Sequence, residues 1–282
     1  MRIYIQTDIE GVAGYVHYYS FSDSIWNYHH VQRMNRLLTA EVNAAALAAK
    51  DAGATEVLVN DNHGAAYNIL FEELDPICRI IHGRPGRGPE WTPCLDSSID
   101  AAVAIGMHAR AGVAGAVCNH SCWHLQDGRG CGYQLSEVAM FGLLCAERGI
   151  PLVAISGDQF ICEEIREWIP DIRVAQVKES LGLQFANSLH PDRSRELIYQ
   201  TVRDGVVGKD SVSMPALAGP FSLNVSDRDP SNKILESDLR GESLSALVID
   251  VCNATGARYG MPEDIDDRSW RYPDSVYSPQ KV

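Results

Sequence analysis

Four short apolar segments constrain the fold of this chain more than any other feature of its sequence. Residues 3–5, 57–59, 101–107 and 152–155 are apolar without alternating with polar residues, and Gly, Asn or Asp lies close to each of them. Segments of this kind are typical of strands whose two faces are both buried, as in a parallel sheet. The sequence therefore predicts an α/β protein built on a mostly parallel sheet.

Three helices are expected among these strands. The first covers about residues 28–52, because apolar residues recur there along one helical stripe and Gly53 is placed to end it. The second covers about residues 136–148 and ends at Gly149, and the third covers about residues 159–168 and stops before Pro170. This alternation of strands and helices predicts helices on both faces of the sheet.

The pattern changes after about residue 180. A helix is expected over about residues 190–207, residues 221–225 resemble a strand, and residues 245–252 resemble either a strand or a helix. A length of 282 residues corresponds to about two domains. We predict an α/β domain over residues 1–180, a smaller C-terminal α+β lobe over residues 181–260 and an extended tail over residues 261–282.

The charge balance restricts the partners of the chain. Asp and Glu number 37 against 24 Lys and Arg, which gives a net charge of −13, and no run of five or more basic residues occurs. This balance argues against a nucleic-acid partner and against binding to an anionic membrane. It also leaves carboxylates available to hold cations.

The expected location is the cytoplasm. No stretch of about 18 apolar residues occurs, and residues 1–5 enter a strand pattern without the charged and apolar regions of a signal peptide. The eight cysteines are scattered through a chain that is too large to depend on a disulfide framework. We therefore expect reduced thiols.

Side chains that bind metals follow three of the expected strands. The strands are followed by Thr7-Asp8-Ile9-Glu10-Gly11, by Asn60-Asp61-Asn62-His63-Gly64 and by Gly106-Met107-His108-Ala109-Arg110. The carboxyl ends of parallel strands meet at one edge of a sheet, where ligands bind. Imidazole and carboxylate groups together are the ligand set of zinc and related metals. Taken singly, Asp8 and Glu10 could be a helix cap and a solvated acid, but together with the two histidines they predict a metal site.

Further candidates lie close to these segments. Glu137 would occupy the first turn of the helix at 136–148, where favouring the helix dipole is its simpler role. His120 could act as a general acid or base, or be an ordinary hydrogen-bonded histidine. Arg110, Asp158 and Lys178 also follow expected strands, in the case of Lys178 a strand near residues 172–177, and are candidates for binding substrate, although Asp158 could simply cap a helix and Lys178 could be a surface charge. The chain has neither a G-x-S-x-G elbow nor a G-x-G-x-x-G motif after a strand, which argues against a serine hydrolase of that type and a nicotinamide enzyme.

Several of these motifs, in this order and spacing, resemble the zinc-dependent D-aminopeptidases of bacterial dipeptide metabolism. The resemblance covers about residues 1–180 and rests on Asp8-Ile9-Glu10-Gly11, Val59-Asn60-Asp61-Asn62-His63, Gly106-Met107-His108-Ala109-Arg110-Ala111, Asn119-His120-Ser121 and Glu137, with Ser156-Gly157-Asp158 and Val177-Lys178 in addition. It implies that two zinc ions are held by Asp8, Glu10, His63, His108 and Glu137. It further implies that His120 is the catalytic residue and that the chain forms a homo-oligomer.

The chain also departs from this family. Asn119 replaces a more usual serine, Ser136 replaces a glycine, and the resemblance weakens beyond about residue 210. We expect the metal ligands to tolerate these changes, whereas substrate choice depends on the divergent part.

The resemblance implies an aminopeptidase that cleaves the N-terminal amide bond of short peptides, with a preference for D-amino acids. In this mechanism a metal-activated water attacks the amide and a histidine transfers the proton. Two other functions remain open. One is an amidase of the same fold that acts on another small amide or on L-peptides. The other is a non-catalytic binding or assembly protein stabilised by its metal.

Overall fold

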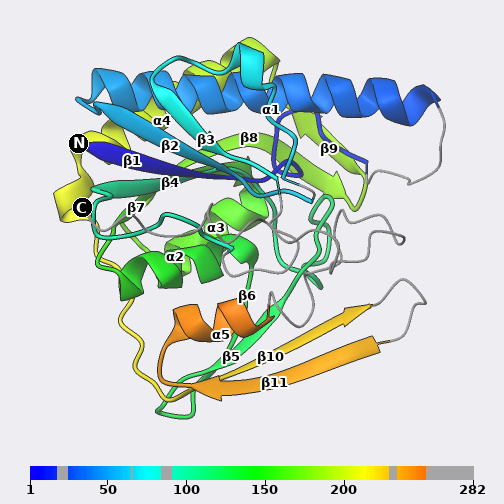
Figure 1. The fold of residues 1–282 in the computed structure, drawn as a ribbon. Coiled ribbons are helices and arrows are strands. Elements are labelled where there is room, and N and C mark those ends of the chain that lie inside the picture. Colours follow the sequence, from blue (N-terminus) through cyan, green and yellow to red (C-terminus); the bar gives the residue numbers. More distant parts are fainter. Residues whose placement is uncertain (18–24, 65, 84–90, 229–233, 252–282) are drawn as a thin grey trace, which may run out of the picture.

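The computed structural model describes residues 1–17, 25–64, 66–83, 91–228 and 234–251. Its main layer is a seven-stranded sheet with the strand order β3-β2-β1-β4-β7-β8-β9 (Figure 1). The strands are β1 (Arg2–Thr7), β2 (Glu56–Asp61), β3 (Cys78–Ile81), β4 (Ala101–Met107), β7 (Leu152–Asp158), β8 (Arg173–Gly182) and β9 (Phe185–Ser188). Neighbouring strands are parallel except for β8 and β9, which form an antiparallel pair. The predicted mostly parallel sheet is confirmed.

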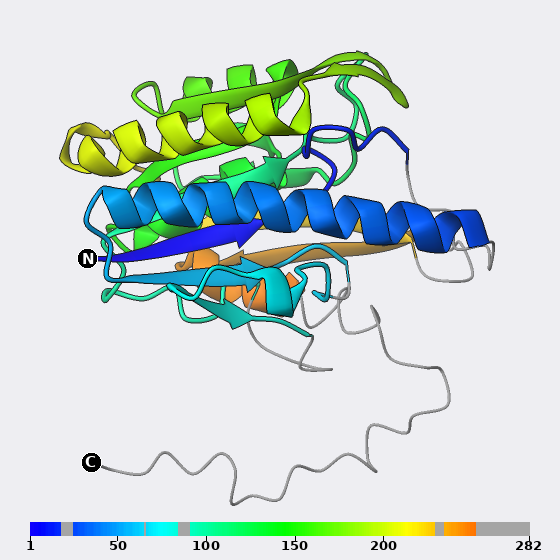
Figure 2. The ribbon, with the colours of Figure 1, turned by 90° about the horizontal axis from the view of Figure 1, so that it is seen from above.

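Helices cover both faces of this sheet, as predicted. Helices α1 (Ile25–Asp51) and α4 (Pro191–Val207) lie side by side on one face (Figure 2). Helices α2 (Glu137–Glu147) and α3 (Gln159–Trp168) cover the other face. The buried side chains of β1 show why both faces must be covered, because Ile3 and Ile5 pack toward α1 while Tyr4 packs toward α2 and α3.

A second, antiparallel sheet lies beside the α2 and α3 layer. Its strands β5 (Trp123–Gln126), β6 (Gly132–Leu135), β10 (Phe221–Arg228) and β11 (Ile234–Gly241) have the order β11-β10-β5-β6. One face packs against α2 and against α5 (Leu244–Val251), around Leu125, Leu135 and Leu223. The segment predicted as a strand or a helix at residues 245–252 is thus a helix, as far as the structure describes it.

The small sheet combines parts of the chain from both sides of residue 180. Strands β5 and β6 precede that residue, whereas β10 and β11 follow it. Helix α4 also follows it, yet packs on α1, β7 and β8 of the large layer. The division into residues 1–180 and 181–260 stays a prediction, and the expected tail at 261–282 lies outside the described residues.

Local sequence sets the ends of the helices. The Ser136 hydroxyl accepts a hydrogen bond from the Ala139 N–H and caps α2, and Asp158 caps α3 by accepting from the Ile161 N–H. Two short 3-10 turns, η1 (Phe71–Glu73) and η2 (Lys209–Ser211), complete the elements. Among the helices that the structure describes, none is long and apolar enough to cross a membrane.

Two glycines allow the carboxyl ends of β1 and β4 to touch. The Gly11 N–H donates to the Gly106 carbonyl over 2.7 Å. A Cβ atom on Gly106 would lie 2.2 Å from the Asp8 carbonyl oxygen, and one on Gly11 would lie 2.0 Å from the Met107 carbonyl oxygen. Gly106 also has a φ of +78°, a conformation that L-residues with a side chain rarely adopt. This contact brings the segment after β1 against the segment after β4.

We expect Gly106→Ala to destabilise the protein far more than Gly53→Ala. Both glycines have positive φ, at +78° and +99°, but a Cβ atom on Gly53 would meet nothing within 4 Å. Gly53→Ala should therefore cost only the backbone strain, about 1 kcal/mol. Gly106→Ala adds a clash with backbone and should cost at least about 3 kcal/mol of unfolding free energy. Urea denaturation measures both, and equal losses would contradict the proposed close contact.

Candidate metal centre

The carboxyl edge of the large sheet brings together every residue predicted to bind metal. Asp8 and Glu10 follow β1, His63 follows β2 and His108 follows β4, while Glu137 is the first residue of α2. With His120 they form three overlapping groups in which the potential ligand atoms lie within 4.8 Å of one another: Asp8, Glu10 and His63; Asp8, His108 and Glu137; Glu10, His108 and His120. The sheet topology thus collects, at one place, residues that are up to 129 positions apart.

The distances inside this cluster are short. His63 Nε2 lies 3.1 Å from Glu10 Oε1. His108 Nε2 lies 3.3 Å from Asp8 Oδ2 and 3.6 Å from Glu137 Oε1. Asp8, Glu10 and His108 are each less than 5% exposed, so these groups meet away from water.

Three atoms of the cluster are buried without a hydrogen-bond partner: Asp8 Oδ2, Glu10 Oε2 and His108 Nε2. Leaving such atoms unsatisfied is costly, because they have lost water without gaining a partner of their own. A divalent cation would satisfy all three, and a set of carboxylate oxygens and imidazole nitrogens matches zinc and its neighbours. The residues present therefore fit a metal.

Backbone and amide groups orient the three histidines. His108 Nδ1 lies 2.8 Å from the Ala109 carbonyl oxygen, and His120 Nδ1 lies 3.0 Å from the Cys118 carbonyl oxygen. His63 Nδ1 lies 3.1 Å from Asn68 Oδ1. Each Nδ1–H therefore has an acceptor, which leaves Nε2 as the atom that faces the cluster, the usual arrangement for metal-binding histidines.

The support of His63 depends on two residues that the sequence did not single out. Asp61 Oδ1 accepts from the Asn68 side-chain amide at 2.8 Å, and Asp61 Oδ2 accepts from the Ile69 N–H at 2.8 Å. The Asn68 amide also donates to the His63 carbonyl at 2.7 Å, which leaves Asn68 Oδ1 to accept from the imidazole. Asp61 is the last residue of β2 and belongs to the Asn60-Asp61-Asn62-His63-Gly64 motif, whereas no sequence pattern marks Asn68.

His120 lies on a conformationally restricted segment. Cys118 and Ser121, which flank it, have φ values of +49° and +54°, a region that costs energy for residues with a side chain. The Cys118 N–H donates to the Leu183 carbonyl at 2.8 Å, which fixes this segment to the turn between β8 and β9. The His120 ring stacks on the His108 ring with a centroid distance of 3.9 Å and an angle of 13°.

Burial and mutual attraction shift the pKa values of these groups. Burial, together with Glu10, raises the pKa of Asp8 well above its ordinary range. Burial would lower the pKa values of His63 and His108, but the neighbouring carboxylates outweigh it and raise both to about 10. Conversely, contact with His108 overcomes burial and lowers the pKa of Glu137 to about 2.

The pKa of Glu10 is also lowered, because His63 outweighs the opposing effect of burial. His120 differs from the other two histidines, since burial and the neighbouring His108 lower its pKa. In the metal-free protein, protons on His63 and His108 thus compensate the buried carboxylates, and His120 is the neutral imidazole of the cluster.

The three candidate substrate-binding residues occupy different surroundings. Arg110 is partly exposed, and its Nε atom lies 4.0 Å from Glu164 Oε2. Asp158 and Lys178 are only 1% and 2% exposed. Asp158 caps α3 and accepts from the Ser180 hydroxyl, while Lys178 donates to backbone carbonyls of the segment after β1. These bonds favour supporting roles for Asp158 and Lys178 over the predicted contact with substrate.

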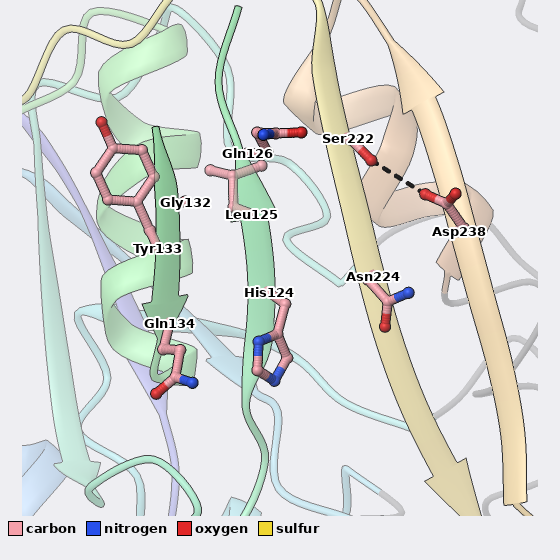
Figure 3. A pocket seen from close by; sticks show the side chains of 9 residues that line it. All are labelled: His124, Leu125, Gln126, Gly132, Tyr133, Gln134, Ser222, Asn224 and Asp238. Atoms are coloured by element: carbon pink, nitrogen blue, oxygen red, sulfur yellow. Dashed lines mark hydrogen bonds between the residues drawn. The ribbon is translucent and has the colours of Figure 1, made fainter. Parts of the chain in front are cut away.

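A shallow cavity of about 470 Å³ lies on the outer face of the small sheet (Figure 3). Polar side chains of all four strands line it, including His124, Gln134, Asn224 and Asp238. Ser222 Oγ donates to Asp238 Oδ1 over 3.0 Å. Its lining shares no residue with the metal-type cluster, so the cavity and the clustered ligands are separate features.

Comparison with known proteins decides the family. A family model described as D-aminopeptidase matches residues 1–233. The chain belongs to the D-aminopeptidase family. The match continues past residue 210, where we expected the resemblance to weaken, and it confirms the predicted peptidase class.

Individual family members agree with this assignment. The D-aminopeptidase of Bacillus subtilis (strain 168) is 27% identical over 220 residues, which cover 75% of this chain and 76% of that protein. The solved structure of the Zn-dependent D-aminopeptidase DppA from Bacillus subtilis, described as a self-compartmentalizing protease, matches with a TM-score of 0.77 and 21% identity. The match covers 93% of this chain and all of that one, and it shows that the two share a fold.

We expect zinc binding to the metal-free protein at pH 7 to release at least two protons. His63 and His108, with pKa values of about 10, carry protons at this pH and must lose them to bind a metal through Nε2. Calorimetry in buffers of different ionisation enthalpy measures the number released. His120→Ala is the control, because the pKa of His120 is lowered and its loss should leave the number unchanged. Zinc binding without proton release would show that these histidines are not ligands.

Proposed function

We propose that the chain is a zinc-dependent aminopeptidase that removes the N-terminal residue of short peptides, with a preference for D-amino acids. Five side chains of the kinds that bind metals lie together, and three of their buried polar atoms lack hydrogen-bond partners. This observation carries the proposal. Membership of the D-aminopeptidase family supports the reaction, and the zinc dependence of the Bacillus subtilis D-aminopeptidase DppA supports the metal.

The three overlapping groups suggest how the ligands would be shared. Asp8 belongs both to the group with Glu10 and His63 and to the group with His108 and Glu137. We infer that Asp8, Glu10, His63, His108 and Glu137 would together hold two zinc ions. When bound, the two ions would lower the pKa of a water molecule and polarise the scissile carbonyl.

His120 is placed to transfer a proton. Its Nδ1–H is engaged by the Cys118 carbonyl, so Nε2 holds the lone pair on the side of Glu10 and His108. Because its pKa is lowered, His120 is neutral at pH 7 and can accept a proton at Nε2. It would then deliver that proton to the amine that leaves when the peptide bond breaks.

The charge of the site favours a neutral substrate bond. Asp8, Glu10 and Glu137 supply three negative charges, which nearly offset two Zn²⁺. A slightly cationic site suits an amide carbonyl and its developing oxyanion better than a phosphate ester. The free amine of the peptide would be held by an acidic group or a metal, and Arg110, which is partly exposed and lies two positions after His108, would contact the rest of the substrate.

We also propose that the protein works in the cytoplasm as a homo-oligomer. All seven cysteines that the structure describes are free thiols, which suits a reducing compartment. Self-compartmentalization, stated for the Bacillus subtilis structure, is the basis for expecting assembly of several copies.

We expect Asp8→Ala and His120→Ala to separate metal binding from turnover. Asp8→Ala removes the shared carboxylate, so zinc content and activity should fall together. His120→Ala should retain both zinc ions, measured by elemental analysis, while kcat falls about 10²- to 10⁴-fold, the range for loss of a general acid or base. Full activity of His120→Ala would contradict the proton-transfer role, and an unchanged zinc content of Asp8→Ala would contradict a ligand role for Asp8.

The proposed specificity is tested with matched D-Ala and L-Ala terminal peptides. Chelator-treated protein should cleave neither, and about two equivalents of zinc should restore cleavage of the D-peptide because the metal supplies the activated water. Cleavage of the L-peptide at an equal rate would contradict the D-preference. Binding of two zinc ions without cleavage of either peptide would redirect the search to other small amides, the alternative left open by the sequence.

A further inference from the structure

Lys178 is a buried cation that the proposed reaction does not use. It lies in β8 and is 2% exposed, so its ammonium group depends on the protein for all its hydrogen bonds. The Nζ atom donates to the carbonyl oxygens of Glu10, of Val12 at 3.2 Å and of Tyr15 at 2.9 Å. A lysine ammonium has three N–H donors, and here three carbonyls accept from them. None is left for a substrate.

The nearby carboxylates do not compete for this ammonium group. Asp158, the partner of Lys178 across β7 and β8, accepts from the Ile161 N–H and from the Ser180 hydroxyl. Glu41 accepts from the Ala13 N–H at 3.1 Å and from the Ser194 hydroxyl at 2.6 Å. Burial lowers the pKa of Lys178 to about 8, which these acids counter from a distance, while its direct contacts are with backbone.

All three contacts fall on one segment, residues 10–15, which follows β1 and includes Glu10. In the sheet, β4 and β7 lie between β1 and β8, so Lys178 ties the segment to a strand that is not its neighbour. The contacted residues are 163 to 168 positions away in the sequence. A single side chain therefore fixes three points of the backbone that carries a proposed metal ligand.

We propose that Lys178 is a positioning residue that sets the direction of the Glu10 carboxylate. By holding the Glu10 carbonyl, it restrains the peptide plane at that residue and hence the direction of its Cα–Cβ bond. This keeps Glu10 Oε1 at 3.1 Å from His63 Nε2 and its second oxygen, Oε2, buried within the cluster. The proposal rests on the proposed metal centre and goes beyond it by assigning the support of the Glu10 side to a residue that does not touch metal or substrate.

The first measurement uses the wild-type protein. Hydrogen exchange of a peptide covering residues 8–16 should show protection in the metal-free protein, because Lys178 orders the segment before any metal arrives. Adding zinc should change this protection little. Free exchange without zinc, followed by protection with zinc, would overturn the proposal, since the metal and not Lys178 would then order the segment.

The second measurement uses Lys178→Met, which keeps the length of the side chain but removes all three donors. We expect exchange of residues 8–16 to rise at least about 10-fold, and zinc affinity, measured by competition with a chelating dye, to fall about 10- to 100-fold, as for other groups that orient ligands. Lys178→Gln retains two donors and should lie between the wild type and Lys178→Met in both measurements. This order keeps the test decisive if Lys178→Met does not fold.

Ser188→Ala is the matched control. The Ser188 hydroxyl accepts from the Gly14 N–H at 3.2 Å, so it ties the same segment without touching Glu10. Its zinc affinity should stay within about 2-fold of the wild type. An equal loss in Ser188→Ala, or an unchanged zinc affinity in both lysine variants, would overturn the positioning role.

The outcomes also separate this proposal from the proposed function. Weaker zinc binding in the lysine variants, with no peptide cleavage by the wild type, would support the positioning role and remove the peptidase assignment. A wild-type protein that binds no zinc would overturn both. Cleavage of D-peptides with equal zinc affinity in all variants would overturn the role of Lys178 alone.

Discussion

The structure is organised around the burial of opposite charges where the parallel strands end. Three carboxylates and two imidazoles meet there with little access to water, and such an arrangement is stable only if positive charge balances the acids. In the metal-free protein the balance comes from protons, which is why the pKa values of His63 and His108 rise to about 10. Metal ions at the same place would supply the positive charge instead, and the histidine nitrogens would then serve as ligands.

This arrangement needs support from the whole sheet, because its members come from distant parts of the chain. Close contact between the ends of β1 and β4 depends on Gly11 and Gly106, which leave room for backbone against backbone. Asn68 orients His63 through its amide oxygen. The Cys118 carbonyl fixes the tautomer of His120. His63 and His120 thus each have a local support in addition to their place at the edge of the sheet.

Sequence patterns predicted those elements whose apolar residues match the faces that the fold buries. Strands β1, β2, β4 and β7 are buried on both faces, so their apolar runs identified them. Helix α3 has the predicted bounds because Asp158 caps its start and Pro170 lies just beyond its end. Strands β5 and β6 were not predicted, since each has only four residues and exposes polar side chains such as His124 and Gln134. The sequence of residues 245–252 was compatible with either a strand or a helix. The structure has a helix, α5, which buries Leu244, Leu247 and Val251 on one face.

The candidate site was also only partly predictable from the sequence, and the reason is physical. Ligand candidates could be found because strand ends converge, a property of any parallel sheet that needs no side-chain detail. The direction of a side chain is a different matter: Lys178 was expected to follow a strand, but it lies within β8 and points inward to backbone carbonyls 163 to 168 positions away. Asn68 likewise orients His63 only because the loop after β2 folds back and brings the Asn68 amide to Asp61.

The interpretation of His120 needs both its sequence motif and its surroundings in the structure. Its motif suggested a catalytic role by resemblance, and its position within 4.8 Å of Glu10 and His108 would equally allow it to be a ligand. We propose proton transfer rather than ligation because five other candidate ligands are present and the ring of His120 stacks on that of His108 at 3.9 Å. Burial, together with a positive charge on His108, lowers the pKa of His120 and so disfavours a proton on its ring in the metal-free protein. The neighbour that places His120 among the candidate ligands is therefore also one that keeps its ring neutral in the metal-free protein.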